Sequence, residues 1–141
     1  MDFFDILVRY EIRLWNHLDR RLADEGAVSL ARWQALRAVR NRGGDGRVQE
    51  ISADLSITVG AASKLVDRLE RDGLVERRRH PSDRRSMLLA LTGEGRTAFD
   101  ETDTLIASEL EAIMAGIEGV GAAAATLTRL DAAIDRAEVD A

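Results

Sequence analysis

The residues with the most distinctive chemistry lie in an arginine-rich stretch in the middle of the chain. Residues 77–85 read RRRHPSDRR and hold five arginines against one aspartate. Guanidinium groups bind phosphates and fit the narrow, electronegative minor groove of DNA. Pro81 and Ser82 favour a turn that projects the arginines away from the body of the protein. The stretch therefore suggests contact with DNA, although an arginine-rich loop by itself is usually only a solvated surface.

One acidic residue stands inside this stretch. Asp83 precedes Arg85 by two residues, so its carboxylate could hold an arginine in an extended pose through a charge-assisted hydrogen bond. We predict that the loop and its edges contact DNA, and the candidate residues are Arg77, Arg78, Arg79, His80, Asp83, Arg84, Arg85 and Ser86.

The elements around the loop predict how it is held. The segments Leu74–Arg79 and Met87–Leu91 flank HPSDRRS and indicate the two strands of a hairpin. Two short helical patterns come before them, Gln49–Leu55 and Val59–Asp72, joined by the turn Ser56-Ile57-Thr58. Arg47-Val48 suggests one further short strand. Two helices, a turn between them and a basic hairpin make a winged helix-turn-helix.

The second helix of such a unit enters the major groove of DNA by its N-terminal end. Ser63 can donate or accept a hydrogen bond, Lys64 can reach a guanine or a phosphate, and Ala61 can touch a thymine methyl group. The alternative is that these side chains only solvate an exposed helix face. The candidate contacts on this helix are Thr58, Gly60, Ala61, Ser63, Lys64 and Arg68.

Long amphipathic helices are predicted at both ends of the chain. Apolar residues between Phe3 and Leu22 recur in steps of three and four on an unusually wide face. Such a face can cover its own domain and a second subunit, although it can also form only an intramolecular core. We predict a mainly α fold with a small β-hairpin wing (α+β), in a single domain, 1–141. Residues 29–95 would form the winged helix-turn-helix DNA-binding lobe, and 1–25 with 96–141 the helical dimerisation lobe.

The charge is distributed unevenly, although its formal sum is only −5. Residues 1–59 hold nine basic and nine acidic side chains, residues 60–96 hold nine and six, and residues 97–141 hold two and ten. Phosphate contacts depend on a local basic patch rather than on the total charge. The distribution therefore favours DNA binding by the middle of the chain.

Several classes of function lack their sequence signals. The absence of cysteine removes disulfides and cysteine-ligated zinc, and the two histidines are predicted in different elements. The chain shows no glycine-rich phosphate loop and no metal-spaced cluster, so we expect no enzyme, no metal and no cofactor. A histidine metal site shared between two subunits, with carboxylates, stays open as an alternative. No apolar run is long enough to span a bilayer, and the N-terminal residues do not read as a signal peptide. We expect a cytoplasmic protein.

Residues 63–95 read SKLVDRLERDGLVERRRHPSDRRSMLLALTGEG. This segment and the order of the elements resemble the MarR (multiple antibiotic resistance regulator) family of bacterial transcription factors. The most specific signature is Asp83-Arg84-Arg85, followed by Leu91-Thr92 and Gly95, and the likeness extends over essentially the whole chain. Two departures from the family are Ser56, where a glycine is frequent, and the apolar or small residues 59–61, where polar residues are frequent.

The resemblance implies a homodimer bound to a pseudo-palindromic operator, usually as a repressor. Arg85 would enter the minor groove with Asp83 orienting it, and Arg77 would lie near the phosphates or the wing base. The family commonly releases DNA when a small phenolic or anionic ligand binds between the dimer helices and the DNA-binding lobe. Candidate residues for that pocket are Arg13, Trp15, His17 and Trp33, although a tryptophan on an amphipathic helix is more often a core residue. An alternative function is a winged-helix protein-interaction module without specific DNA binding.

Overall fold

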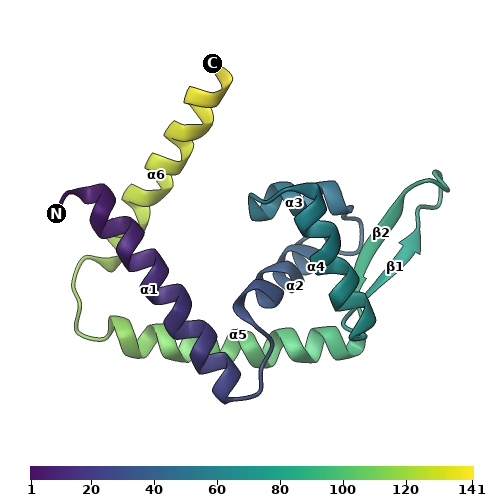
Figure 1. Cartoon of the computed structure of the whole chain (residues 1–141), viewed down its shortest axis with the longest axis horizontal. Helices are drawn as coiled ribbons and strands as arrows, with labels where there is room; N and C mark the ends of the chain where they lie inside the picture. Colours follow the sequence, from purple (N-terminus) through teal and green to yellow (C-terminus); the bar gives the residue numbers. More distant parts are fainter. The chain divides into compact units, whose positions relative to one another are not determined.

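The computed structural model describes all 141 residues, as six helices and one two-stranded antiparallel hairpin (Figure 1). The chain forms two compact units, Met1–Ala107 and Ser108–Ala141. Helix α5 (Gly93–Met114) begins in the first unit and ends in the second. The predicted fold class, mainly α with a β-hairpin wing, is confirmed.

The first unit opens with two helices whose ends follow local chemistry. Helix α1 (Phe3–Asp24) stops just before Gly26, which adopts the left-handed φ of +68°. Helix α2 (Leu30–Asn41) begins after Ser29, whose hydroxyl accepts a hydrogen bond from a backbone N–H of the first turn at 3.3 Å. The side chains that these helices bury include Leu18, Leu22, Trp33, Leu36 and Val39.

The helix-turn-helix follows as predicted. Helix α3 (Val48–Leu55) and helix α4 (Val59–Arg71) flank a turn in which Ser56 has a left-handed φ of +54°. A glycine adopts that conformation without a steric penalty, so the position explains why glycine suits this turn. The hydroxyl of Thr58 accepts from the N–H of Ala61 at 3.1 Å and caps α4. The turn therefore fixes where α4 begins.

The hairpin also forms where the sequence predicts it. Strand β1 (Val75–Arg79) pairs antiparallel with strand β2 (Met87–Leu91), from Val75 opposite Leu91 to Arg79 opposite Met87. A single bridge joins Gly46 to Leu89, with the Leu89 N–H donating to the Gly46 carbonyl at 2.9 Å.

The predicted short strand at Arg47-Val48 is wrong. Val48 is already the first residue of α3, and the strand-like contact is made one residue earlier, by Gly46. The Arg47 N–H donates to the Glu50 carboxylate at 3.2 Å. A side chain three residues ahead thus caps the backbone here, and the chain turns into a helix instead of extending along β2.

One junction fixes the base of the wing to α5. The Thr92 hydroxyl donates to the Gly73 carbonyl at 2.6 Å and accepts from the Gly95 N–H at 3.0 Å. A Cβ at Gly95 would lie 1.9 Å from the Leu74 carbonyl oxygen, so only glycine allows the helix to approach this closely. The end of α4, the hairpin and the start of α5 are thereby joined at one point.

The second unit contains the end of α5 and helix α6 (Val120–Val139). Gly116 and Gly119, both with positive φ, separate the two helices. No residue of α6 is buried, and Leu127, Leu130 and Ile134 are among its exposed apolar side chains. Helix α6 therefore leaves an apolar stripe uncovered within the single chain.

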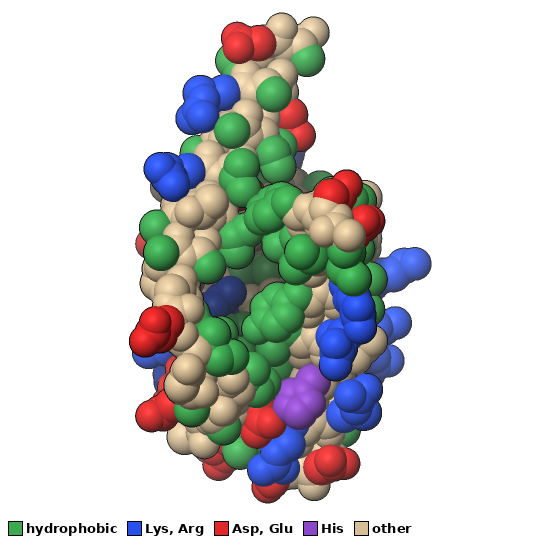
Figure 2. All heavy atoms as spheres, turned by 90° about the vertical axis from the view of Figure 1, so that its left-hand side faces the viewer, with side chains coloured by type: hydrophobic (Ala, Val, Ile, Leu, Met, Phe, Trp, Pro, Cys, Tyr) green, Lys and Arg blue, Asp and Glu red, His purple; other side chains and the backbone are tan.

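Helix α1 also exposes apolar side chains. They are Phe3, Phe4, Ile6, Val8, Tyr10 and Ile12. Figure 2 shows that hydrophobic side chains are numerous on the face of the molecule that lies at the left of Figure 1. No helix of the structure is long and apolar enough to cross a membrane.

Candidate nucleic-acid interface

Helix α4 presents the predicted recognition residues on its outer side. Ala62, Val66 and Leu69 are buried against the domain, so the opposite face of the helix is turned outward. Ser63 is half-buried, and the remaining members of the predicted set are exposed: Thr58, Gly60, Ala61, Lys64 and Arg68. The side chains suited to major-groove contact therefore lie together on the first half of the helix and one turn beyond.

The tip of the wing is organised by Asp83. One oxygen of its carboxylate accepts from the backbone N–H of Arg85 at 3.0 Å, and the other accepts from the hydroxyl of Ser86 at 3.0 Å. These two hydrogen bonds, the first being the larger cause, lower the pKa of Asp83 below its ordinary value. The predicted hydrogen bond from an arginine guanidinium to the Asp83 carboxylate is absent, so Asp83 orients Arg85 through the backbone N–H of Arg85.

The arginines of the tip have no ion-pair partner. Arg79, Arg84 and Arg85 are exposed, and no carboxylate lies within ion-pair distance of their guanidinium groups. His80 supports the turn through its Nδ1, which accepts from the Ser82 N–H at 3.0 Å. The tip is thus a fixed turn that carries unpaired positive charge.

Arg77 is held differently, at the base of the wing. Its guanidinium donates to Asp67 at 2.6 Å and to Glu70 at 2.8 Å, both on α4, and its side chain is only 22% exposed. The hydrogen bond to Asp67 is the largest cause of a raised Arg77 pKa. Arg77 therefore lies at the wing base, as the resemblance implied, where it braces β1 against α4. Its neighbour Arg78 pairs with Glu76 of the same strand.

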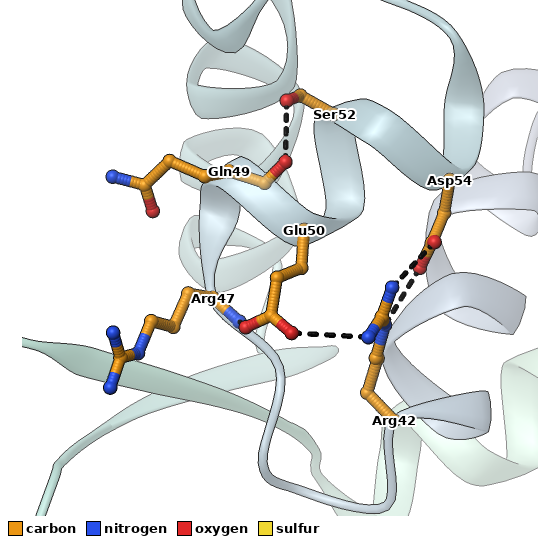
Figure 3. A network of polar contacts seen from close by, with 6 residues as sticks. All are labelled: Arg42, Arg47, Gln49, Glu50, Ser52 and Asp54. Carbon is orange, nitrogen blue, oxygen red and sulfur yellow. Dashed lines mark hydrogen bonds and ion pairs between the residues drawn. The ribbon is translucent and has the colours of Figure 1, made fainter.

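A polar network outside the predicted set positions α3 (Figure 3). Arg42 donates from Nε and Nη2 to Asp54 at 2.9 and 2.6 Å and from Nη1 to Glu50 at 3.0 Å. The hydrogen bond from Arg42 lowers the pKa of Asp54. The network holds the loop after α2 against α3. Arg42 lies eight and twelve residues before its two partners, too far for a helical spacing to reveal the pairing.

Arg47 belongs to the same loop but points away from this network (Figure 3). Its positive charge is one of the smaller causes of the lowered pKa of Asp83, at the tip of the wing. Arg47 was not among the predicted contacts, because its segment reads as a short strand. It precedes the first residue of α3 and is a further cation near the helix-turn-helix.

The four residues predicted for a ligand pocket lie on α1 and α2. Arg13 is exposed, and Trp15 and His17 are half-buried. Trp33 is 8% exposed and stacks on Phe99 with ring centroids 6.3 Å apart, so it is a core residue. Its indole N–H is nevertheless buried without a hydrogen-bond acceptor.

A helix-turn-helix followed by an arginine-tipped hairpin defines the winged helix-turn-helix class of protein. Residues 28–87 match the model of the MarR family. This segment, which contains the helix-turn-helix and most of the hairpin, is therefore similar to the MarR family.

Two curated relatives match the same part of the chain. The transcriptional regulator BilQ of Clostridium symbiosum is 37% identical over 57 residues, or 40% of this chain and 40% of BilQ. The multiple antibiotic resistance protein MarR of Escherichia coli is 34% identical over 61 residues, or 43% of this chain and 42% of that protein. The matches thus span about two fifths of the length of these relatives.

The structural similarity reaches further along the chain. The transcriptional repressor CouR bound to a 23-mer DNA duplex is 26% identical, with a TM-score of 0.81 over 94% of this chain and 92% of that one. CouR from Rhodococcus jostii RHA1 bound to p-coumaroyl-CoA is 24% identical, with a TM-score of 0.78 over 90% and 88%. The fold is therefore shared well beyond the helix-turn-helix.

Proposed function

We propose that this protein is a dimeric, sequence-specific DNA-binding transcriptional regulator. The observation that carries the proposal is the wing. Its base is tied to α4 by Arg77, and its tip carries Arg84 and Arg85 without ion-pair partners. An unpaired guanidinium on a fixed turn can meet DNA phosphates or the minor groove without first giving up a carboxylate.

Helix α4 and the wing divide the contacts. The first half of α4 lies in the major groove, where Ser63, Lys64 and Arg68 meet base edges or phosphates, and Thr58, Gly60 and Ala61 allow close approach. In the wing, the residues that contact DNA directly are Arg79, Arg84 and Arg85. The turn that carries them is held by hydrogen bonds of His80, Asp83 and Ser86. Arg77 supports the wing from its base, and Arg78 is a further wing residue, paired with Glu76 of the same strand.

A second copy of the chain covers the exposed apolar stripes of α1 and α6. Reading a two-fold operator requires two recognition helices one DNA turn apart, which a single chain of this size cannot provide. Residues 1–25 and 96–141 form this dimerisation lobe, and 29–95 form the DNA-binding lobe. The acidic residues 97–141 keep the distal lobe away from DNA.

Small-molecule control is the remaining part of the proposal. CouR is a repressor that binds p-coumaroyl-CoA, and a phenolic or anionic effector is proposed for this protein as well. Arg13 and His17, one turn apart on α1, can meet an anion, and the unpaired indole N–H of Trp33 can donate to an acceptor. The protein acts in the cytoplasm, as a repressor and not as an enzyme.

The test begins with selection of bound duplexes from a random DNA library. Fluorescence anisotropy on the selected duplex should show that the logarithm of affinity falls linearly with that of salt concentration, with a slope of about −0.9 for each phosphate contacted. Analytical ultracentrifugation of the free and bound protein should give a dimer. No enrichment of any duplex, together with weak binding that salt leaves unchanged, would favour the protein-interaction module instead.

A further inference from the structure

The start of α4 exposes a large apolar side chain. Beyond α1, the first unit exposes only three such side chains, Ile57, Val59 and Met87, which keep 39%, 49% and 38% of their surface accessible. Ile57 lies in the turn before α4, Val59 is the first residue of α4, and Met87 is the first residue of β2. Outside α1, the exposed large apolar side chains of this unit are therefore confined to the helix-turn-helix and the wing.

The local structure explains Ile57 but not Val59. The Ile57 N–H donates to the Ser52 carbonyl at 3.1 Å, and an apolar residue at this position commonly packs on the preceding helix. Val59 has no such role, because Thr58 already caps α4 and a β-branched side chain does not favour a helix. Nothing in the construction of α4 therefore requires a valine at its first position.

The residues that follow Val59 leave the end of the helix open. Gly60 is exposed, and a Cβ added to it would meet nothing within 4 Å. The exposed methyl group of Ala61 comes next. Because the Cβ atoms of a helix tilt toward its N-terminus, the side chains of Val59 and Ala61 lean toward whatever the N-terminal end of α4 meets. They stand on either side of bare backbone with free space above it.

The charges near this end favour DNA as its occupant over an apolar protein surface. Lys64 and Arg68 are exposed on the same helix, and the arginines of the wing tip have no carboxylate partner. A surface of this kind attracts a polyanion. The major groove of DNA offers an aliphatic side chain one apolar group, which is the C5 methyl of thymine. That methyl is small enough to enter the open space beside Gly60.

We propose that Val59 is a specificity-determining residue that contacts the C5 methyl group of a thymine in each operator half-site. The proposal rests on the proposed function and deepens it, because it assigns one class of base to one side chain. Val59 lies outside the contacts predicted from the sequence. The start of α4 then reads an apolar group, and Ser63 and Lys64 supply polar contacts further along the helix.

The direct test replaces thymine by uracil in the duplex selected from the random library. A uracil–adenine pair differs from a thymine–adenine pair only in lacking the C5 methyl. Each thymine is replaced in turn by deoxyuridine, and fluorescence anisotropy with the full chain gives the affinity. One position in each half-site should lose about fourfold, the factor expected from burial of one methyl-sized group. Equal affinity for every uracil-containing duplex and the thymine duplex would overturn the proposal.

A pair of variants assigns the contact to Val59. Val59→Ser should bind the thymine duplex and the sensitive uracil duplex equally well, because no isopropyl group remains to contact the methyl. Val139→Ser is the matched control, since it makes the same change at the last residue of α6, which is 86% exposed. This control should keep the full preference for thymine. A full preference for thymine in Val59→Ser would contradict the assignment.

A third variant guards against a folding defect. Val59→Ala shortens the side chain and favours the helix more than valine does, so α4 should form at least as well. Its preference for thymine over uracil should still be reduced. An undiminished preference in Val59→Ala and Val59→Ser alike would overturn the role of Val59.

The outcome is separable from that of the proposed function. A protein that selects a duplex but binds its thymine and uracil forms alike keeps the proposed function and loses the role of Val59. A protein that selects no duplex loses both, and the exposed apolar end of α4 would then favour the protein-interaction module.

Discussion

The two ends of the hairpin hold their arginines in opposite electrostatic states. At the base, Arg77 lies between Asp67 and Glu70 of α4 and is largely shielded from solvent. At the tip, Arg84 and Arg85 are exposed and unpaired. One continuous basic stretch therefore divides into two parts: a brace, which fixes the wing against α4, and a reader, which is the part that we propose contacts DNA.

The difference follows from what each guanidinium would give up on meeting a phosphate. Arg77 would have to break two charge-assisted hydrogen bonds, and this cost offsets most of the gain from a new one. Arg85 would give up only water, while its backbone is already fixed by Asp83. An arginine-rich loop is thus a poor guide to the number of DNA contacts until the pairing of each side chain is known.

The largest effect is expected at the tip. Arg85→Ala should cost about 1–3 kcal/mol of binding free energy on the selected duplex, because it removes an unpaired guanidinium from a fixed position. Fluorescence anisotropy at constant salt gives the affinity. Arg136→Ala, which removes an exposed arginine of α6, is the matched control and should leave the affinity unchanged. Equal losses in the two variants would mean that the wing tip has no special role.

A smaller effect of a different kind is expected at the base. Arg77→Met keeps most of the apolar stem but leaves Asp67 and Glu70 without their partner, so binding should weaken because the wing is no longer held. The slope of log affinity against log salt concentration should remain that of the unaltered protein. In contrast, Arg84→Ala should reduce that slope by about one. The loss of folding stability should be only about 1 kcal/mol, since both carboxylates are substantially exposed to solvent.

Thermal unfolding followed by circular dichroism measures that loss, and anisotropy at several salt concentrations gives the slope. A slope reduced by about one in Arg77→Met would show that Arg77 contacts a phosphate in the complex. The distinction between brace and reader would then be wrong, because Arg77 itself would contact DNA.

Much of the fold could be predicted because its signals are local. Three such signals act within a few residues of the chain: the cap at Thr58, Gly73 after α4 and the turn residues between the strands. The strand predicted at Arg47-Val48 is wrong for a local reason as well. Two residues are too few to show a strand periodicity, and the hydrogen bond from the Arg47 N–H to the Glu50 carboxylate starts a helix there instead.

The sequence predicts a set of candidate site residues, but it does not predict how their side chains pair. Arg77 and its partner Asp67 are ten residues apart, in a strand and a helix, and only the packing of the hairpin on α4 joins them. Asp83 was correctly linked to Arg85, yet the spacing alone could not distinguish a hydrogen bond to the backbone from one to the guanidinium. Pairing between side chains of different elements depends on tertiary structure, and the periodicity of the sequence does not predict it.

A further prediction concerns the support of the tip. Asp83→Asn should weaken DNA binding severalfold, less than Arg85→Ala, because an amide replaces one of the two acceptor oxygens. Since the pKa of Asp83 is lowered by folding, its contribution is complete above the ordinary aspartate value of about 3.9 and is lost only as the pH falls through the lower, folded value. The Arg85 amide resonance should therefore stay constant from about pH 5 to 8 and move only in more acidic solution. A change centred near neutral pH would contradict this account of the turn.

The smallest effect is expected on the recognition helix. Lys64→Ala should cost less than about 1 kcal/mol of binding free energy, because its long exposed side chain must be ordered to make any contact and no neighbour holds it in advance. Measuring both the selected duplex and a scrambled one separates two roles. A loss on both duplexes indicates a phosphate contact, and a loss on the selected duplex alone indicates a base contact. A cost as large as that of Arg85→Ala would reverse the comparison and make α4, rather than the tip of the wing, the principal reader.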